Sequence, residues 1–187
     1  MKKVIILLAE GFEEIEALTC VDVLRRGNIE CKICSINSKE DVKGAHGIIV
    51  KVDSLLKNIN EDEYHAVILP GGMPGAVNLR DNEKVIEIVR KFDRENKIIA
   101  AICAAPIVLK KAGIIYNRKV TSYPGFEEEL QAYNYSEEIV VQEGNLITSR
   151  GPATAVYFTF KILENLVDKN IVENLKKDLL LDLVKNE

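Results

Sequence analysis

The 187-residue sequence predicts an α/β fold in which a mainly parallel sheet is covered by helices on both faces. Two observations lead to this prediction. Short apolar runs of strand length alternate along the chain with segments of helical periodicity. The runs are also nearly continuous in their apolar character, which is typical of strands buried on both faces.

The predicted elements follow one another along the whole chain. Strands are expected at Lys3–Ala9, Ile29–Ile36, Ala66–Leu69 and Ile98–Ile102, an extended piece at Gly47–Val52, and a hairpin at Val140–Gln142 and Leu146–Thr148. Helices are expected at Glu13–Arg26, Glu83–Glu95, Ala105–Ala112, Ala153–Val167 and Ile171–Val184. No repeat or linker divides the chain, so residues 1–187 are expected to form a single domain.

Charge and hydropathy exclude several classes of partner. The 25 basic and 29 acidic residues give a net charge of −4, which argues against nucleic acid or an anionic membrane as a partner. The apolar run after Lys3 ends at Glu10 without a cleavage pattern, and no stretch reaches the roughly 20 apolar residues that span a bilayer. We therefore expect a cytoplasmic protein.

Three of the four cysteines are expected to be core residues. Cys20, Cys31 and Cys34 lie in apolar elements, where reduced thiols are expected. Cys31 and Cys34 have C-x-x-C spacing, but residues three apart on a strand point to opposite faces. Redox or metal chemistry is therefore not expected of this pair.

Cys103 is the predicted nucleophile. A buried strand runs directly into it, small residues follow, and Pro106 stands where the first turn of a helix tolerates proline. This is the strand–turn–helix arrangement that holds a nucleophile on a strained elbow. The free N–H groups of the helix start, including that of Ala104, are expected to lower the thiol pKa and to hold an oxyanion. The alternative is a small buried core residue, which the elbow context disfavours.

Other candidate residues also follow predicted strands, because parallel sheets bind ligands beyond the carboxyl ends of their strands. The segment Pro70–Gly75 is rich in glycine but lacks the Lys and Ser/Thr of a phosphate-binding loop. The N–H of Gly72 is predicted to be a second oxyanion donor. The alternative, a tight turn that needs positive φ, is compatible with that role. The segment Ser149–Gly151 is expected near the same crevice.

Glu16 is the acid predicted to lie beside Cys103. Glu13 and Glu14 fall in the first helical turn, where carboxylates suit the helix dipole and need no further role. Glu16 lies one turn deeper among apolar residues, where burial would raise its pKa and keep it protonated. Such a carboxyl can share a proton with the Cys103 thiol and act as general acid or base. The alternative, a solvated helix carboxylate, fits the helical periodicity equally well.

The histidines and the first helix complete the prediction. His65 is expected at the surface, and His46 lies in a glycine-rich turn. No spacing suggests a metal site, and no cofactor is expected. Between Ile15 and Leu24 the only polar residues are Glu16, Thr19 and Asp22. A helix this apolar needs cover beyond the sheet, so we expect a homodimer through it.

Five segments in order carry a family resemblance over nearly the whole chain. They are Glu10–Glu16, Val21–Arg26, Leu69–Gly72, Ala100–Pro106 and Leu146–Pro152. Together they resemble the ThiJ/PfpI superfamily, and within it the DJ-one branch. The resemblance implies a flavodoxin-like three-layer fold, a homodimer and no cofactor. It also implies a reactive Cys103 beside a protonated Glu16, with backbone donors at Gly72 and Ala104.

The resemblance also implies a set of functions. The leading expectation is a cysteine-dependent enzyme for reactive carbonyls, either glyoxalase III-like (methylglyoxal to lactate) or deglycase-like. The alternative is an oxidative-stress sensor or chaperone that acts through oxidation of Cys103. An amidase or peptidase comes third, because Tyr123 stands where many relatives have the histidine that such a mechanism needs as its base. Tyr123 is instead expected to hydrogen-bond a substrate oxygen. The resemblance also implies that His46 extends towards the active site of the partner subunit in the dimer.

Overall fold

The computed structural model describes residues 1–184 and contains one seven-stranded sheet and two small two-stranded sheets. The strands are β1 (Lys3–Leu8), β2 (Glu30–Ser35), β3 (Asp41–Lys43), β4 (Ile49–Lys51), β5 (Ser54–Leu55), β6 (Ala66–Leu69), β7 (Ile98–Ile102), β8 (Lys119–Val120), β9 (Asn134–Tyr135), β10 (Val140–Glu143) and β11 (Leu146–Ser149). The helices are α1 (Glu14–Arg26), α2 (Gly75–Arg80), α3 (Glu83–Arg94), α4 (Pro106–Ala112), α5 (Glu127–Leu130), α6 (Ala155–Glu164), α7 (Lys169–Asp178) and α8 (Leu181–Val184). Short 3₁₀ turns occupy Leu56–Asn58, Glu61–Glu63 and Pro152–Thr154.

The large sheet has the strand order β10-β11-β7-β6-β1-β2-β5. All neighbouring pairs are parallel except β10 and β11, which form the predicted antiparallel hairpin. The carboxyl ends of β11, β7, β6 and β1 therefore lie side by side at one edge. The segments that follow these strands meet there, with residue 103 between residues 70–72 and residues 150–151.

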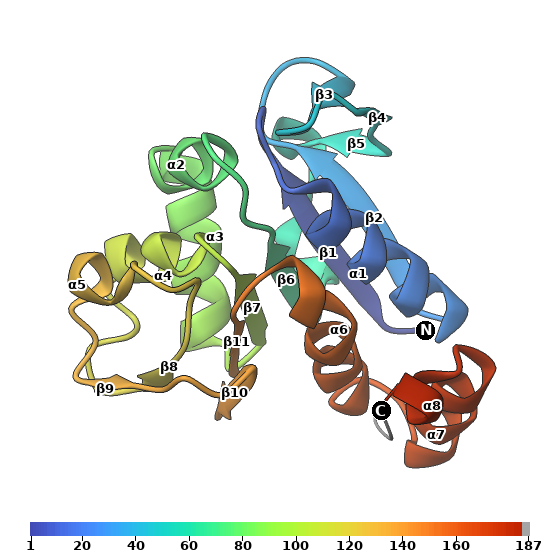
Figure 1. The fold of residues 1–187 in the computed structure, drawn as a ribbon. Helices are drawn as coiled ribbons and strands as arrows, with labels where there is room; N and C mark the ends of the chain where they lie inside the picture. The colour runs from blue at the N-terminus through green and yellow to red at the C-terminus, as the bar shows by residue number, and fades with distance from the viewer. Residues whose placement is uncertain (185–187) are drawn as a thin grey trace.

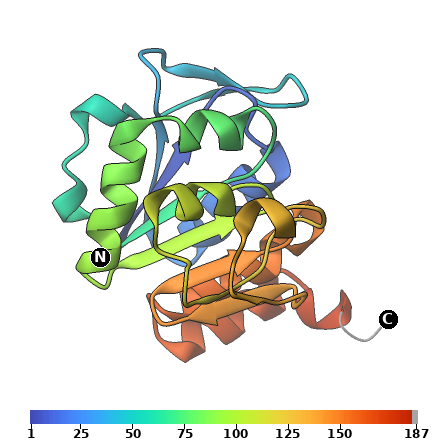
Figure 2. The same ribbon diagram turned by 90° about the vertical axis from the view of Figure 1, so that its left-hand side faces the viewer.

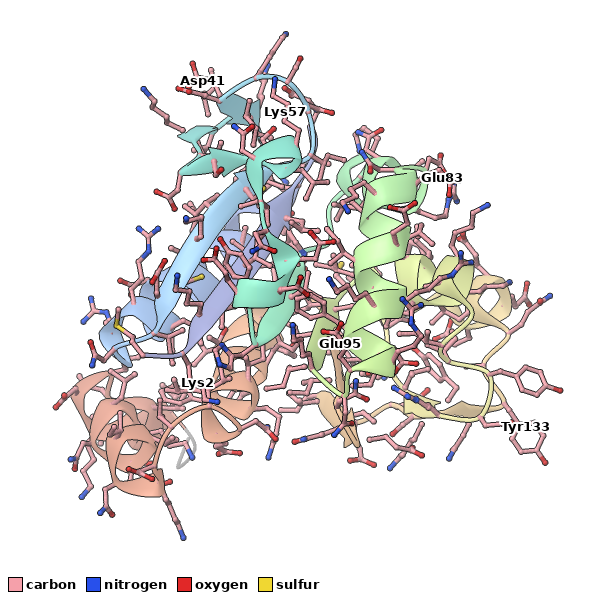
Figure 3. The ribbon with its side chains drawn as sticks, turned by 180° about the vertical axis from the view of Figure 1, so that it is seen from behind. Lys2, Asp41, Lys57, Glu83, Glu95 and Tyr133 are labelled. Carbon is pink, nitrogen blue, oxygen red and sulfur yellow. The ribbon has the colours of Figure 1, made fainter. Side chains whose placement is uncertain are left out.

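Helices cover both faces of this sheet (Figure 1). One core cluster joins one face of the strands to α1, α6 and α7, and a second joins the other face to α2, α3 and α4. Figure 3 shows the second face, where Glu83 and Glu95 mark the two ends of α3. Cys31 lies in the first cluster and Cys34 in the second, which confirms that this pair points to opposite faces. The α/β prediction is also confirmed.

The extended piece expected at Gly47–Val52 contains β4, which pairs with β3 in a hairpin that projects from one end of the molecule (Figure 2). Other local predictions are wrong. The single helix expected at Ile171–Val184 is two, because Leu180 takes a left-handed φ of 56° between α7 and α8. Helix α2 and the small β8–β9 sheet were not expected. His65 is half-buried rather than at the surface, and its Nδ1 accepts a hydrogen bond from the N–H of Lys3 at 3.3 Å.

Candidate functional site

Cys103 occupies a strained turn between β7 and α4. Its φ of 64° lies in the left-handed region, which is uncommon for any residue other than glycine and costs about 1–3 kcal/mol. The surrounding backbone holds the turn: the N–H of Cys103 donates to the carbonyl of Ser149 at 3.0 Å, and its carbonyl accepts from the N–H of Tyr123 at 2.9 Å. Pro106 begins α4, as predicted. The expected elbow is therefore present.

Glu16 extends from α1 to the segment after β6 and is fully buried. Its Oε2 accepts a hydrogen bond from the N–H of Gly71 at 2.7 Å. Its Oε1 is buried and has no hydrogen-bond partner of good geometry among the described residues. The alternative of a solvated helix carboxylate is excluded, because no part of the side chain reaches solvent.

The absence of a side chain at Gly71 allows this carboxyl and Cys103 to lie close together. A Cβ atom at Gly71 would lie 2.7 Å from Cβ of Cys103 and 2.8 Å from Oε2 of Glu16. Both groups therefore occupy the space that any other residue would fill. The sequence analysis did not single out Gly71, although the double glycine at the end of a strand was the available signal.

Burial raises the pKa of Glu16 to about 7, and the hydrogen bonds from Gly71 and Cys103 act in the opposite direction. This confirms the predicted direction. Burial, followed by the charge of Glu16 and the hydrogen bond to it, raises the pKa of the Cys103 thiol to about 12, although the N–H groups of Ala104 and Gly72 lower it. The sequence predicts that the pKa of this thiol is lowered, and that expectation is wrong. The helix-start donors act as expected, but burial and the neighbouring anion outweigh them.

These two groups titrate as a pair, because each negative charge opposes the other. The first proton leaves near neutral pH and the second stays until strongly alkaline pH. At neutral pH the pair can therefore hold one proton and one negative charge. Moving the shared proton from the sulfur of Cys103 to the carboxylate of Glu16 gives a thiolate without adding charge to the buried site.

The predicted oxyanion donors lie at this sulfur. The N–H groups of Ala104 and Gly72 both act on the Cys103 thiol as hydrogen-bond donors. Gly72 has a φ of 86°, and a Cβ there would meet the backbone of Glu13 at 2.4 Å, so only glycine fits. The turn and the donor role predicted for Gly72 are thus both compatible with its position.

Tyr123 lies beside the elbow, at the position where many relatives have a histidine, but its side chain is not buried as a catalytic base would be. Its backbone is bonded to Cys103, and its side chain is 47% exposed. The ring lies against Gly151, two residues after the end of β11: a Cβ atom at Gly151 would lie 3.2 Å from ring carbon Cδ2. The segment Ser149–Gly151 therefore reaches the same crevice, as expected.

His46 belongs to a separate arrangement at the start of α1. Its Nδ1 lies 2.8 Å from Oε2 of Glu14 and 3.5 Å from Glu13, and Glu14 also accepts from the N–H of His46 at 2.8 Å and of Ile48 at 3.4 Å. Burial acts to raise the pKa of Glu14, but these hydrogen bonds together lower it. The hydrogen bond to Glu14 raises the pKa of His46. The expectation that Glu13 and Glu14 need no further role is therefore wrong, since Glu14 holds the loop at residues 44–48.

Glu13, Glu14 and His46 are also the group within residues 1–184 whose ligand atoms lie close enough, within 4.8 Å of one another, to share a metal ion. Ion pairing and hydrogen bonding already account for this geometry. Within residues 1–184, no helix is both long and apolar enough to cross a bilayer.

Comparison with known proteins identifies the family of this chain. Residues 2–165 match the model of the DJ-1/PfpI family. The chain is 39% identical over 183 residues to Protein dj-1beta of Drosophila melanogaster, which covers 96% of this chain and 97% of that protein. The crystal structure of that protein superimposes with a TM-score of 0.91, covering 96% of this chain and 97% of that one.

Two further relatives bear on chemistry. A protein named as a deglycase, from Pyrococcus horikoshii, is 38% identical over 154 residues, which cover 81% of this chain and 91% of that protein. A structure described as Toxoplasma gondii DJ-1 in an oxidized form has a TM-score of 0.91 and 35% identity, covering 96% of this chain and 98% of that one.

Proposed function

The chain belongs to the DJ-1/PfpI family, and we propose that it is a cofactor-free enzyme that uses Cys103 to convert small α-oxoaldehydes, such as methylglyoxal, into hydroxy acids. One observation carries the proposal. Cys103, whose backbone is in the left-handed region, lies beside a fully buried carboxyl whose pKa is about 7, and two backbone N–H groups lie at its sulfur. The related deglycase supports the same class of reactive carbonyl substrate, free or as an early adduct.

The reaction requires only these groups and water. The sulfur of Cys103 attacks the aldehyde carbon, and the carbonyl oxygen takes a proton to give a hemithioacetal. While the negative charge is on that oxygen, the N–H groups of Gly72 and Ala104 stabilise it. Glu16 removes the proton from the same carbon and returns it to the neighbouring carbon, while the hydroxyl proton passes to the neighbouring oxygen, which yields a lactoyl thioester. Water then releases lactate and restores the thiol.

Lactate formation from methylglyoxal by matched variants tests this proposal. Wild type and Glu87→Gln, an exposed acid on α3, are expected to turn over equally. Cys103→Ser and Glu16→Gln are each expected to lose at least about 100-fold in rate, the scale of a lost general acid–base group. Equal lactate production by all four proteins would refute the proposal.

The second candidate is a redox sensor, favoured by the same N–H groups. The thiolate sulfur of Cys103 would attack one oxygen of hydrogen peroxide, break the O–O bond and release water, giving a sulfenic acid. A second peroxide would give the sulfinate, whose oxygens could accept from Gly72, Ala104 and protonated Glu16. Intact mass after mild peroxide discriminates. A gain of two oxygens at Cys103, without turnover of aldehyde, favours the sensor.

We also propose a homodimer through α1. Ile15 is 57% exposed, and Leu18, one turn further on, and Ile48 are exposed as well. The N–H of Ile48 bonds to Glu14, so these apolar side chains lie at the same end of α1. A second copy would cover them. In sedimentation, Ile15→Glu is expected to give monomers, whereas Ile171→Glu on α7 leaves the dimer intact. A monomeric wild type at micromolar concentration refutes the proposal.

A further inference from the structure

Gly151 lies beside the elbow, yet its backbone does not require glycine. Its φ of 172° is extended backbone that any residue adopts. Among the described residues, the two atoms within 4 Å of a Cβ placed there are Cδ2 and Cε2 of the Tyr123 ring, at 3.2 and 3.6 Å. The missing side chain therefore leaves room for this ring against the backbone.

The backbone of Tyr123 fixes where the ring begins. The N–H of Tyr123 donates to the carbonyl of Cys103, and the N–H of Cys103 donates to Ser149, two residues before Gly151. The ring thus packs on Gly151, two residues after the end of β11, the strand next to β7 in the sheet. With its Cδ2–Cε2 edge towards Gly151 and the residue 47% exposed, much of the ring surface stays open to solvent.

We propose that the Tyr123 ring, held in place by Gly151, forms an apolar wall beside Cys103 that selects electrophiles carrying a flat aromatic substituent. The wall deepens the function proposed above, and its substrate class is aryl α-oxoaldehydes such as phenylglyoxal. Stacking against an aromatic ring favours such a substituent over a methyl group by roughly three- to tenfold. Tyr123 provides the contact surface, and Gly151 is a positioning residue.

Alkylation of Cys103 measures the preference without depending on turnover. The thiolate displaces iodide from iodoacetamide or from N-phenyl iodoacetamide, and the ratio of the two rates reports the aromatic preference. Intact mass follows each reaction, and Cys103→Ser corrects for Cys20, Cys31 and Cys34, all of which are buried. The same variants are then tested for the ratio of kcat/KM between phenylglyoxal and methylglyoxal.

The variants separate the ring from its hydroxyl and from general damage. Tyr123→Phe keeps the ring and is expected to keep the wild-type rate ratio, whereas Tyr123→Ala lowers it roughly three- to tenfold. Gly151→Ala is expected to lower the ratio in the wild-type background and to change nothing when combined with Tyr123→Ala. Tyr133→Ala is the matched control, because this tyrosine points outward at the edge of the molecule (Figure 3).

The two proposals fail in different ways. An unchanged alkylation ratio in Tyr123→Ala, or a Gly151→Ala effect that persists without the ring, overturns the wall. A clear effect of Tyr123 on alkylation, with no turnover of either aldehyde by wild type, supports the wall and overturns the enzymatic function.

Discussion

Replacing Glu16 by Gln tests the buried carboxyl through the pH dependence of stability. Burial raises the pKa of Glu16 from 4.5 to about 7, so the folded protein binds this proton more tightly than the unfolded chain does. Stability must then fall as pH rises from 4.5 to 7 and show no further change from this group above pH 7. A shift of this size corresponds to about 3 kcal/mol. Glu16→Gln removes the titration, so its stability relative to wild type should rise by about that amount over the same interval.

Urea unfolding at pH 4.5, 5.5, 6.5 and 8 measures the difference directly. Comparison of the variant with wild type at each pH cancels the titration of groups that both proteins share. Glu87→Gln, an exposed acid on α3, is the control and should give a nearly constant difference. If the Glu16→Gln difference is also constant, or falls with pH, Glu16 does not carry a raised pKa and the proton-sharing pair does not exist.

Three further predictions concern the same part of the molecule. Alkylation of Cys103 by iodoacetamide should rise through about pH 7 in wild type, and this step should vanish in Glu16→Gln, as a pH–rate profile will show. His46→Ala should lower the melting temperature more at pH 6 than at pH 9, because the raised pKa of His46 makes its pairing with Glu14 stabilising at low pH and lost as pH rises through that pKa. An equal loss at both pH values contradicts this. Gly71→Ala should destabilise the fold by about 1–3 kcal/mol and slow alkylation of Cys103 in the folded protein, because the new Cβ overlaps both Cys103 and Glu16.

The elbow could be predicted because its signals are local in sequence. A fully apolar strand, small residues and a first-turn proline identify Cys103 within nine residues, and the same reasoning places Ala104 beside it. The buried strands were equally clear from their continuous apolar runs. Predictions that needed only neighbouring residues were therefore the most accurate.

The state of Glu16 could not be predicted in the same way, because it depends on segments far apart in the chain. Whether this carboxyl lies in water or against Cys103 is decided by the packing of α1 on the sheet and by the N–H of Gly71, 55 residues away. The pKa of the thiol was misjudged for the same reason. Donors at the start of α4 can be read locally, but the burial of the thiol and the opposing charge of Glu16 both depend on other elements. The helix expected at Ile171–Val184 shows that a local signal can also mislead, since its helical periodicity continues across the break at Leu180.

Two buried glutamates on α1 show what decides the chemistry of this site. Glu14 and Glu16 are two residues apart and both lie below 5% exposure. Glu14 accepts hydrogen bonds from the ring and N–H of His46 and from Ile48, and its pKa is lowered. Glu16 accepts from the N–H of Gly71 and from the Cys103 thiol, and its pKa is raised.

Burial acts to raise both pKa values: at Glu14 the hydrogen bonds outweigh it, whereas at Glu16, which lies deeper, they do not. A carboxylate that only held α1 in place would gain stability from the donors that Glu14 has. Glu16 has fewer of them, and an ionised Glu16 costs the fold about 3 kcal/mol at neutral pH. Its hydrogen bond with the Cys103 thiol is what allows the carboxyl to exchange a proton with that thiol. The instability at Glu16 and the reactivity of Cys103 therefore have one physical cause.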